Sequence, residues 1–97
     1  MMHTYALSNY LKQDPASFDS EFNKKIKDFL DKKKAELSLK GVFYTYYSKN
    51  DDYGHHIKMG FFSENEIGDV EKLKEEIKSL IKDKLEKQGD MSQGIIY

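Results

Sequence analysis

Residues 42–47 read Val-Phe-Tyr-Thr-Tyr-Tyr, and residues 55–62 read His-His-Ile-Lys-Met-Gly-Phe-Phe. Both stretches are rich in aromatic and β-branched residues, which are typical of β-strands. The residues between them, Lys-Asn-Asp-Asp-Tyr-Gly at 49–54, are turn formers. A connection this short cannot carry a parallel crossover, so we expect an antiparallel hairpin at the centre of the fold.

A helix is predicted on each side of this hairpin. Residues 15–39 place apolar side chains three or four positions apart, which indicates one apolar helix face. Asp14, followed by proline, predicts the start of this helix, and Gly41 predicts a left-handed cap after its end. The second helix is expected over about residues 69–88, with Leu85 on its apolar stripe.

The two ends of the chain read as further strands. Residues 3–11 alternate well enough for a strand, with a helical turn as the alternative, and residues 94–97 read as a short terminal strand. The order β-α-β-β-α-β predicts one α+β domain over residues 1–97, a ferredoxin-like two-layer sandwich. The alternative is α-β-β-α with a central antiparallel hairpin, which is marginally stable without further strands.

The hairpin carries large side chains on both faces, although two helices can cover only one face of a sheet. Alternation places Tyr44 and Tyr46 on one face and Phe43 and Tyr47 on the other. We therefore expect an exposed aromatic patch, which is typical of an interaction site. The candidate contact residues are Phe43, Tyr44, Tyr46, Tyr47, Lys58 and Phe62.

Three occupants of this patch remain open. A second copy packed face to face, or another protein, fits the frequency of aromatic residues at protein interfaces. Stacked nucleobases fit the use of sheet aromatics in RNA-recognition modules of the same topology. In the third reading the tyrosines tolerate water, and the chain ends or the first helix cover the remaining apolar side chains.

Charge and composition favour protein over nucleic acid. The formal net charge is −1, and all 16 basic residues are lysines, so the chain has no guanidinium to grip a phosphate in bidentate fashion. The absence of cysteine excludes disulfides and thiolate metal sites, and no sequence motif calls for a cofactor. No run approaches the ~20 apolar residues of a membrane span, and the first residues do not read as a signal peptide, so we expect a cytoplasmic location.

The adjacent pair His55-His56 is the main catalytic candidate. Adjacent strand residues point to opposite faces, so the two imidazoles do not form one metal site or one acid–base pair, and His3 is expected near Phe62 rather than near His55. Residues 54–56, Gly-His-His, resemble the Gly-Ser-His-His stretch of a family of small mRNA-interferase toxins, although the serine is missing. The resemblance implies a ribonuclease in which His55 or His56 does acid–base work.

These observations predict a small, non-enzymatic protein that acts by binding, as a homodimer or with another protein. Occlusion or scaffolding would be its mode of action, because no catalytic constellation stands out in the sequence. Such a chain also suits the small regulatory proteins by which phages and mobile elements inhibit host machinery. The alternatives are an RNA-binding module and a histidine-dependent ribonuclease.

Overall fold

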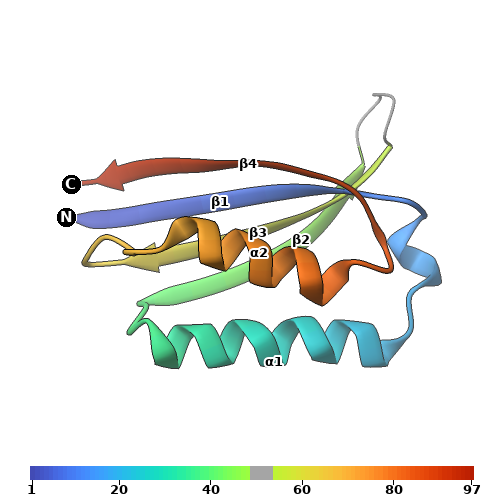
Figure 1. Cartoon of the computed structure of the whole chain (residues 1–97), viewed down its shortest axis with the longest axis horizontal. Helices are drawn as coiled ribbons and strands as arrows, with labels where there is room; N and C mark the ends of the chain where they lie inside the picture. The colour runs from blue at the N-terminus through green and yellow to red at the C-terminus, as the bar shows by residue number, and fades with distance from the viewer. Residues whose placement is uncertain (49–53) are drawn as a thin grey trace.

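The computed structural model describes residues 1–48 and 54–97. It contains one antiparallel sheet with strand order β2-β3-β1-β4, and both helices pack on the same face of that sheet (Figure 1). The elements in chain order are β1 (Met2–Leu11), a 3-10 turn (Pro15–Ser17), α1 (Ser20–Glu36), β2 (Gly41–Ser48), β3 (His55–Ser63), α2 (Val70–Ile81) and β4 (Leu85–Ile96). The predicted order β-α-β-β-α-β is confirmed, and the two-stranded alternative is wrong.

The core lies between the sheet and the two helices. Tyr5, Leu7 and Leu11 of β1 alternate toward the helices, and they lie beside Ile57, Met59 and Phe61 of β3. The helices contribute buried residues three or four positions apart, namely Ile26 and Leu30 from α1 and Leu73, Ile77 and Ile81 from α2. This single apolar layer fits the predicted single domain. No helix in the described parts of the chain is long and apolar enough to cross a membrane.

The start of α1 differs from the prediction. Asp14 does cap a turn, since its side chain accepts a hydrogen bond from the backbone N–H of Ala16, but that turn is a short 3-10 helix. The α-helix begins at Ser20, where Asp19 is the N-cap and accepts from the N–H of Phe22 at 2.9 Å. The two capping aspartates lie five positions apart, so the α-helix begins later than predicted, after a separate capped turn.

The end of α1 also differs from the prediction. Ser38 adopts the left-handed conformation with a φ of 52°, and Gly41 is instead the first residue of β2. The predicted hairpin turn falls on residues 49–53, which lie outside the described residues. Gly54, with a φ of 77°, leads into β3.

The largest difference concerns residues 82–93. The sequence predicts a helix to about residue 88, but α2 ends at Ile81 and Leu85 begins a strand of 12 residues. β4 contains two β-bulges, where its register against β1 shifts. Leu85, Gln88 and Met91 face the helices before, between and after the two bulges, respectively. A spacing of three in a bulged strand resembles a helical repeat, and this explains the wrong prediction.

Candidate functional site

The face of the sheet opposite the helices, here named the open face, carries alternate residues of all four strands. Its rows across β2, β3 and β1 are Phe43, Gly60 and Ala6, then Thr45, Lys58 and Ser8, then Tyr47, His56 and Tyr10. Phe62 lies beyond the first row, opposite Thr4. The largest side chains therefore gather on β2 and β3, while β1 contributes small residues along most of its length.

Two phenylalanines form the apolar part of the open face. The ring of Phe43 lies directly over Gly60, so that any side chain at position 60 would collide with it. Its centroid is 6.0 Å from that of Phe62, and Phe43 remains 39% exposed. Because Gly60 has no side chain, the Phe43 ring can pack directly against the sheet. The pair therefore presents to the solvent an apolar surface that the sheet supports from below.

Gly60→Ala is expected to displace the Phe43 ring and to lower the free energy of unfolding by about 1 kcal/mol, the scale of one aromatic pair. Cross-peaks between the Phe43 and Phe62 rings in a nuclear Overhauser spectrum report the displacement, and urea unfolding reports the stability. Gly68→Ala is the matched control, because a methyl group there meets no atom within 4 Å. Unchanged ring cross-peaks in Gly60→Ala would contradict this packing.

A second cluster on the open face encloses His56. Its ring stacks on Tyr47 at 4.7 Å with an interplanar angle of 9°, and meets Tyr10 edge-on at 4.6 Å. The hydroxyl of Tyr47 also donates a hydrogen bond to Oγ of Ser8 at 3.0 Å. His56 is only 1% exposed as a result. Its ring packs within the sheet surface, out of reach of a bulky substrate.

The six candidate contact residues do not share one face. Phe43, Tyr47, Lys58 and Phe62 lie on the open face, whereas Tyr44 and Tyr46 point to the helix side and pack against the core. The hydroxyl of Tyr46 donates to Oδ1 of Asn23 on α1 at 2.6 Å. Burial, with a smaller contribution from Tyr44, raises the pKa of Tyr46 to about 12. Four of the six candidate contact residues therefore lie on the open face.

Lys58 is the charged residue of the middle row. It is half-buried between Thr45 on β2 and Ser8 on β1, and it forms no ion pair with any residue of 1–48 or 54–97. An ammonium that has no carboxylate partner among the described residues, and that lies beside the Phe43–Phe62 pair, favours a ligand surface that combines apolar groups with a carboxylate.

The histidines do not form one site. His55 points to the helix side, where its Nδ1 lies 3.2 Å from Oγ of Ser48, while His56 lies on the open face. His3 pairs with Ser63, next to Phe62 and at the other end of β3 from His55, as the sequence predicted. Within the described ranges no group of three or more metal-ligating side chains comes together. His55 and His56 therefore form no joint acid–base pair that would support the ribonuclease hypothesis.

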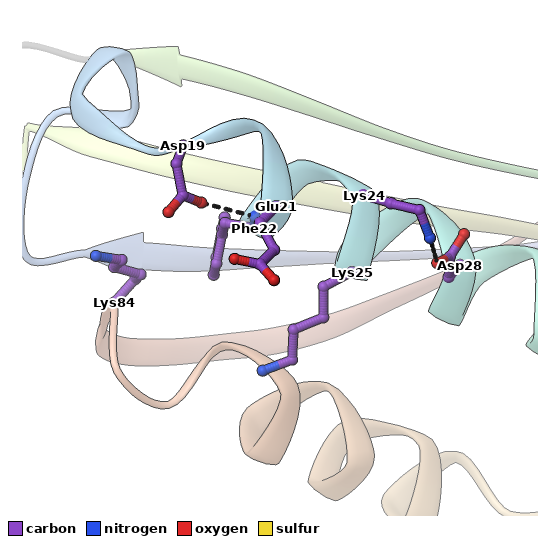
Figure 2. Close-up of a pocket in the computed structure, with 7 residues that line it drawn as sticks. All are labelled: Asp19, Glu21, Phe22, Lys24, Lys25, Asp28 and Lys84. Carbon is purple, nitrogen blue, oxygen red and sulfur yellow. Dashed lines mark hydrogen bonds and ion pairs between the residues drawn. The ribbon is translucent and has the colours of Figure 1, made fainter.

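A hollow lies between the start of α1 and the connection from α2 to β4 (Figure 2). It has a volume of about 760 Å³, and charged side chains of both signs line it around Phe22. Asp19 is used as the helix cap, and Lys24 pairs with Asp28 at 2.7 Å along the helix surface. Asp19, Lys24 and Asp28 therefore serve local structure, and no histidine, serine or threonine is among the described residues that line the hollow.

Comparison with known proteins bears on the fold. No protein-family model matches the chain, and no curated protein matches it either. A crystal structure of a dimeric protein of unknown function and ferredoxin-like fold from Bacteroides fragilis NCTC 9343 is similar, with a TM-score of 0.61. The similarity covers 98% of this chain and 96% of that one, at 13% sequence identity. The chain has a ferredoxin-like fold. At this identity the similarity concerns the architecture alone.

Proposed function

We propose that this chain is a non-enzymatic binding protein that contacts a protein partner through the open face of its sheet. The observation that carries the proposal is the Phe43–Phe62 pair, a partly exposed apolar surface in which the Phe43 ring lies over Gly60 of β3. Large rigid side chains of this kind dominate the energy of protein interfaces. Because the sheet already fixes both rings, a partner binds them without a large loss of side-chain entropy.

The polar surroundings of the pair restrict the partner. Lys58 supplies a positive charge beside it, while Thr4, Ala6 and Ser8 of β1 leave room for protruding side chains. The complementary surface is therefore apolar opposite the rings and acidic opposite Lys58. A nucleic acid would need more cationic contacts than this face offers, since affinity for phosphates depends on their number.

Regulation by occlusion is the mode of action that we propose, because a flat sheet face covers a partner's surface without performing chemistry on it. The inhibitor role expected from the sequence depends on the identity of that partner and stays a prediction. Self-association is a further part of the proposal, and the dimeric state of the similar Bacteroides fragilis protein supports it.

The test compares Phe62→Asp with Leu37→Asp. Both place a carboxylate on a surface apolar residue, but Leu37, 37% exposed, lies at the end of α1 and away from the open face. In affinity capture from the organism that encodes the chain, we expect one or more proteins to be retained by the wild type and by Leu37→Asp. Phe62→Asp is expected to lose them, with at least a tenfold loss in affinity, since central aromatic contacts contribute about 2 kcal/mol or more.

Two results would overturn the proposal. One is a captured protein whose binding is the same for Phe62→Asp and wild type, because the open face would then be uninvolved. The other is binding of RNA by the wild type that falls steeply with salt and is lost in Phe62→Asp, which would assign the face to nucleic acid. Urea unfolding of each variant verifies that both retain the fold.

A further inference from the structure

The two edge strands of the sheet are protected to different degrees. β4 has two bulges in its register with β1, and it carries Glu86, Lys87 and Asp90. Bulges and charges are the usual devices that prevent an edge from pairing with another strand. β2 pairs with β3 without interruption from Gly41 to Ser48 and contains no charged residue and no proline. Its outer edge therefore remains competent to accept another strand.

A groove lies along this unprotected edge, lined by residues of α1 and β2. It has a volume of about 310 Å³, and its apolar floor is formed by Leu30, Val42, Phe43 and Tyr44. Lys27 and Asp31 of α1 line its rim, one helical turn apart. A strand added to β2 would place every second side chain on the helix side, where this groove can receive it.

We propose that β2 pairs antiparallel with β2 of a second copy of the chain, about a two-fold axis that passes by Phe43. The position of the groove places the two-fold axis at Phe43. Of the β2 residues that line the groove, Val42 and Tyr44 point to the helix side of the sheet, and Phe43 lies midway between them. The axis places Val42 opposite the partner's Tyr44, and Tyr44 opposite the partner's Val42. Such aromatic and β-branched cross-strand pairs stabilise an antiparallel ladder.

Charge complementarity on α1 identifies a second copy as the occupant. The same axis sets the two α1 helices side by side and antiparallel, so that Lys27 faces the partner's Asp31 and Asp31 faces the partner's Lys27. An isologous interface always duplicates its contacts in this way. Both side chains are exposed, and neither forms an ion pair with any described residue of its own chain. Pairing would satisfy both charges at once.

The assembly leaves the open face unobstructed. Pairing at β2 joins the two four-stranded sheets edge to edge, so that two open faces lie side by side with the two Phe43 rings at their junction. This inference gives the self-association proposed above its contact surface, and it is independent of partner binding by the open face, since it uses the strand edge and the helix side of the sheet. It concerns how copies assemble, whereas the open face concerns what they bind.

Charge reversal tests the pairing. We expect the wild type to sediment at about twice the 11.4 kDa chain mass. Lys27→Glu or Asp31→Lys alone replaces two symmetric attractions with two repulsions and is expected to raise the dimer dissociation constant about tenfold. The double variant Lys27→Glu/Asp31→Lys restores opposite charges across the axis, and its dissociation constant is expected to return to within about threefold of wild type. Sedimentation equilibrium measures all four proteins.

Phe62→Asp separates this inference from the proposed function. It is expected to leave the dimer intact, because Phe62 lies on β3 and away from the outer edge of β2. A wild-type monomer at 100 µM, or single reversals that leave the dissociation constant unchanged, would overturn the edge pairing. A dimer that Phe62→Asp dissociates and the reversals do not would overturn it as well, and would leave the open face as the contact between copies.

Discussion

Replacing Lys33 with methionine is expected to lower the free energy of unfolding by about 2–3 kcal/mol, since removing one partner of a buried ion pair leaves the charge of the other partner uncompensated. Lys33 lies between the two helices with a side chain that is only 9% exposed. Its Nζ donates to Glu36 of α1 at 2.9 Å and also contacts Glu76 of α2. It lies 5.7 Å from the centroid of the Phe29 ring. Without the ammonium, two carboxylates face each other across the helix interface.

The direction of the pKa shifts supports this expectation. Burial alone would lower the pKa of Lys33, but hydrogen bonds and charge attraction from Glu76 and Glu36 outweigh burial, and its pKa is raised. The hydrogen bond from Lys33 is in turn the main reason why the pKa of Glu36 lies below its usual value. The charged forms are thus favoured by folding, which is the condition for an ion pair that stabilises the native state.

Lys24→Met is the matched control for Lys33→Met. Lys24 pairs with Asp28 on the same helix at 2.7 Å, but its side chain is 74% exposed. Solvent screens an exposed pair of this kind, so Lys24→Met is expected to change the free energy of unfolding much less than Lys33→Met does. Urea unfolding of both variants measures the difference, and a loss in Lys33→Met no larger than in Lys24→Met would contradict the account. Lys33→Met/Glu76→Met is expected to recover part of the loss, because both partners are then removed.

The same contacts predict a pH dependence. The lowered pKa of Glu36 means that its contribution is present above the carboxylate's ordinary pKa and is lost as the pH falls through the folded value. The stability difference between wild type and Lys33→Met is therefore expected to shrink below about pH 4, where carboxylates become protonated. Denaturation at a series of pH values measures this, and a difference that is constant down to pH 3 would argue against the ion pair.

The hairpin and the element order were predictable because local signals agree with the tertiary structure there. Residues 42–47 and 55–62 alternate regularly, and β2 and β3 pair without a bulge, so a period of two holds along the whole hairpin. The faces could also have been assigned: Ile57, Met59 and Phe61 mark the core side of β3, and Tyr44 and Tyr46 are paired with Met59 and Ile57. The alternation alone does not say which face the helices cover, and for this reason both tyrosines are among the contact residues predicted from sequence.

Residues that act through register were not predictable in the same way. In the sequence, Gly60 is a residue that weakens a strand. Only its pairing with Phe43 shows that the space above this glycine holds the Phe43 ring. The bulges of β4 depend on contact with β1, which the local sequence does not encode. Likewise the difference between the two sheet edges appears only once the strand order is known, because either β2 or β4 reads alone as an ordinary strand.

Gly89→Ala is expected to lower the free energy of unfolding by about 3 kcal/mol, the upper end of the cost of forcing extra atoms into a packed region. Gly89 and Asp90 form one of the bulges of β4 and together oppose Ser8 of β1. A methyl group at Gly89 would lie 2.5 Å from the carbonyl oxygen of Ser8. This obstacle is backbone in a strand paired on both sides, so relief requires a shift of β1 or of the bulge.

The comparison with Gly68→Ala isolates the clash from the general effect of replacing glycine. Gly68 meets nothing within 4 Å, and alanine there is expected to be neutral or to stabilise by about 0.5 kcal/mol through the unfolded chain. Urea unfolding of the two variants should therefore differ in sign or by several-fold in size. If Gly89→Ala and Gly68→Ala had equal free energies of unfolding, the bulge would be able to move away from the added methyl group at little cost. In that case the bulges would not hold β4 rigid, and the contrast between a protected β4 edge and an unprotected β2 edge would lose part of its basis.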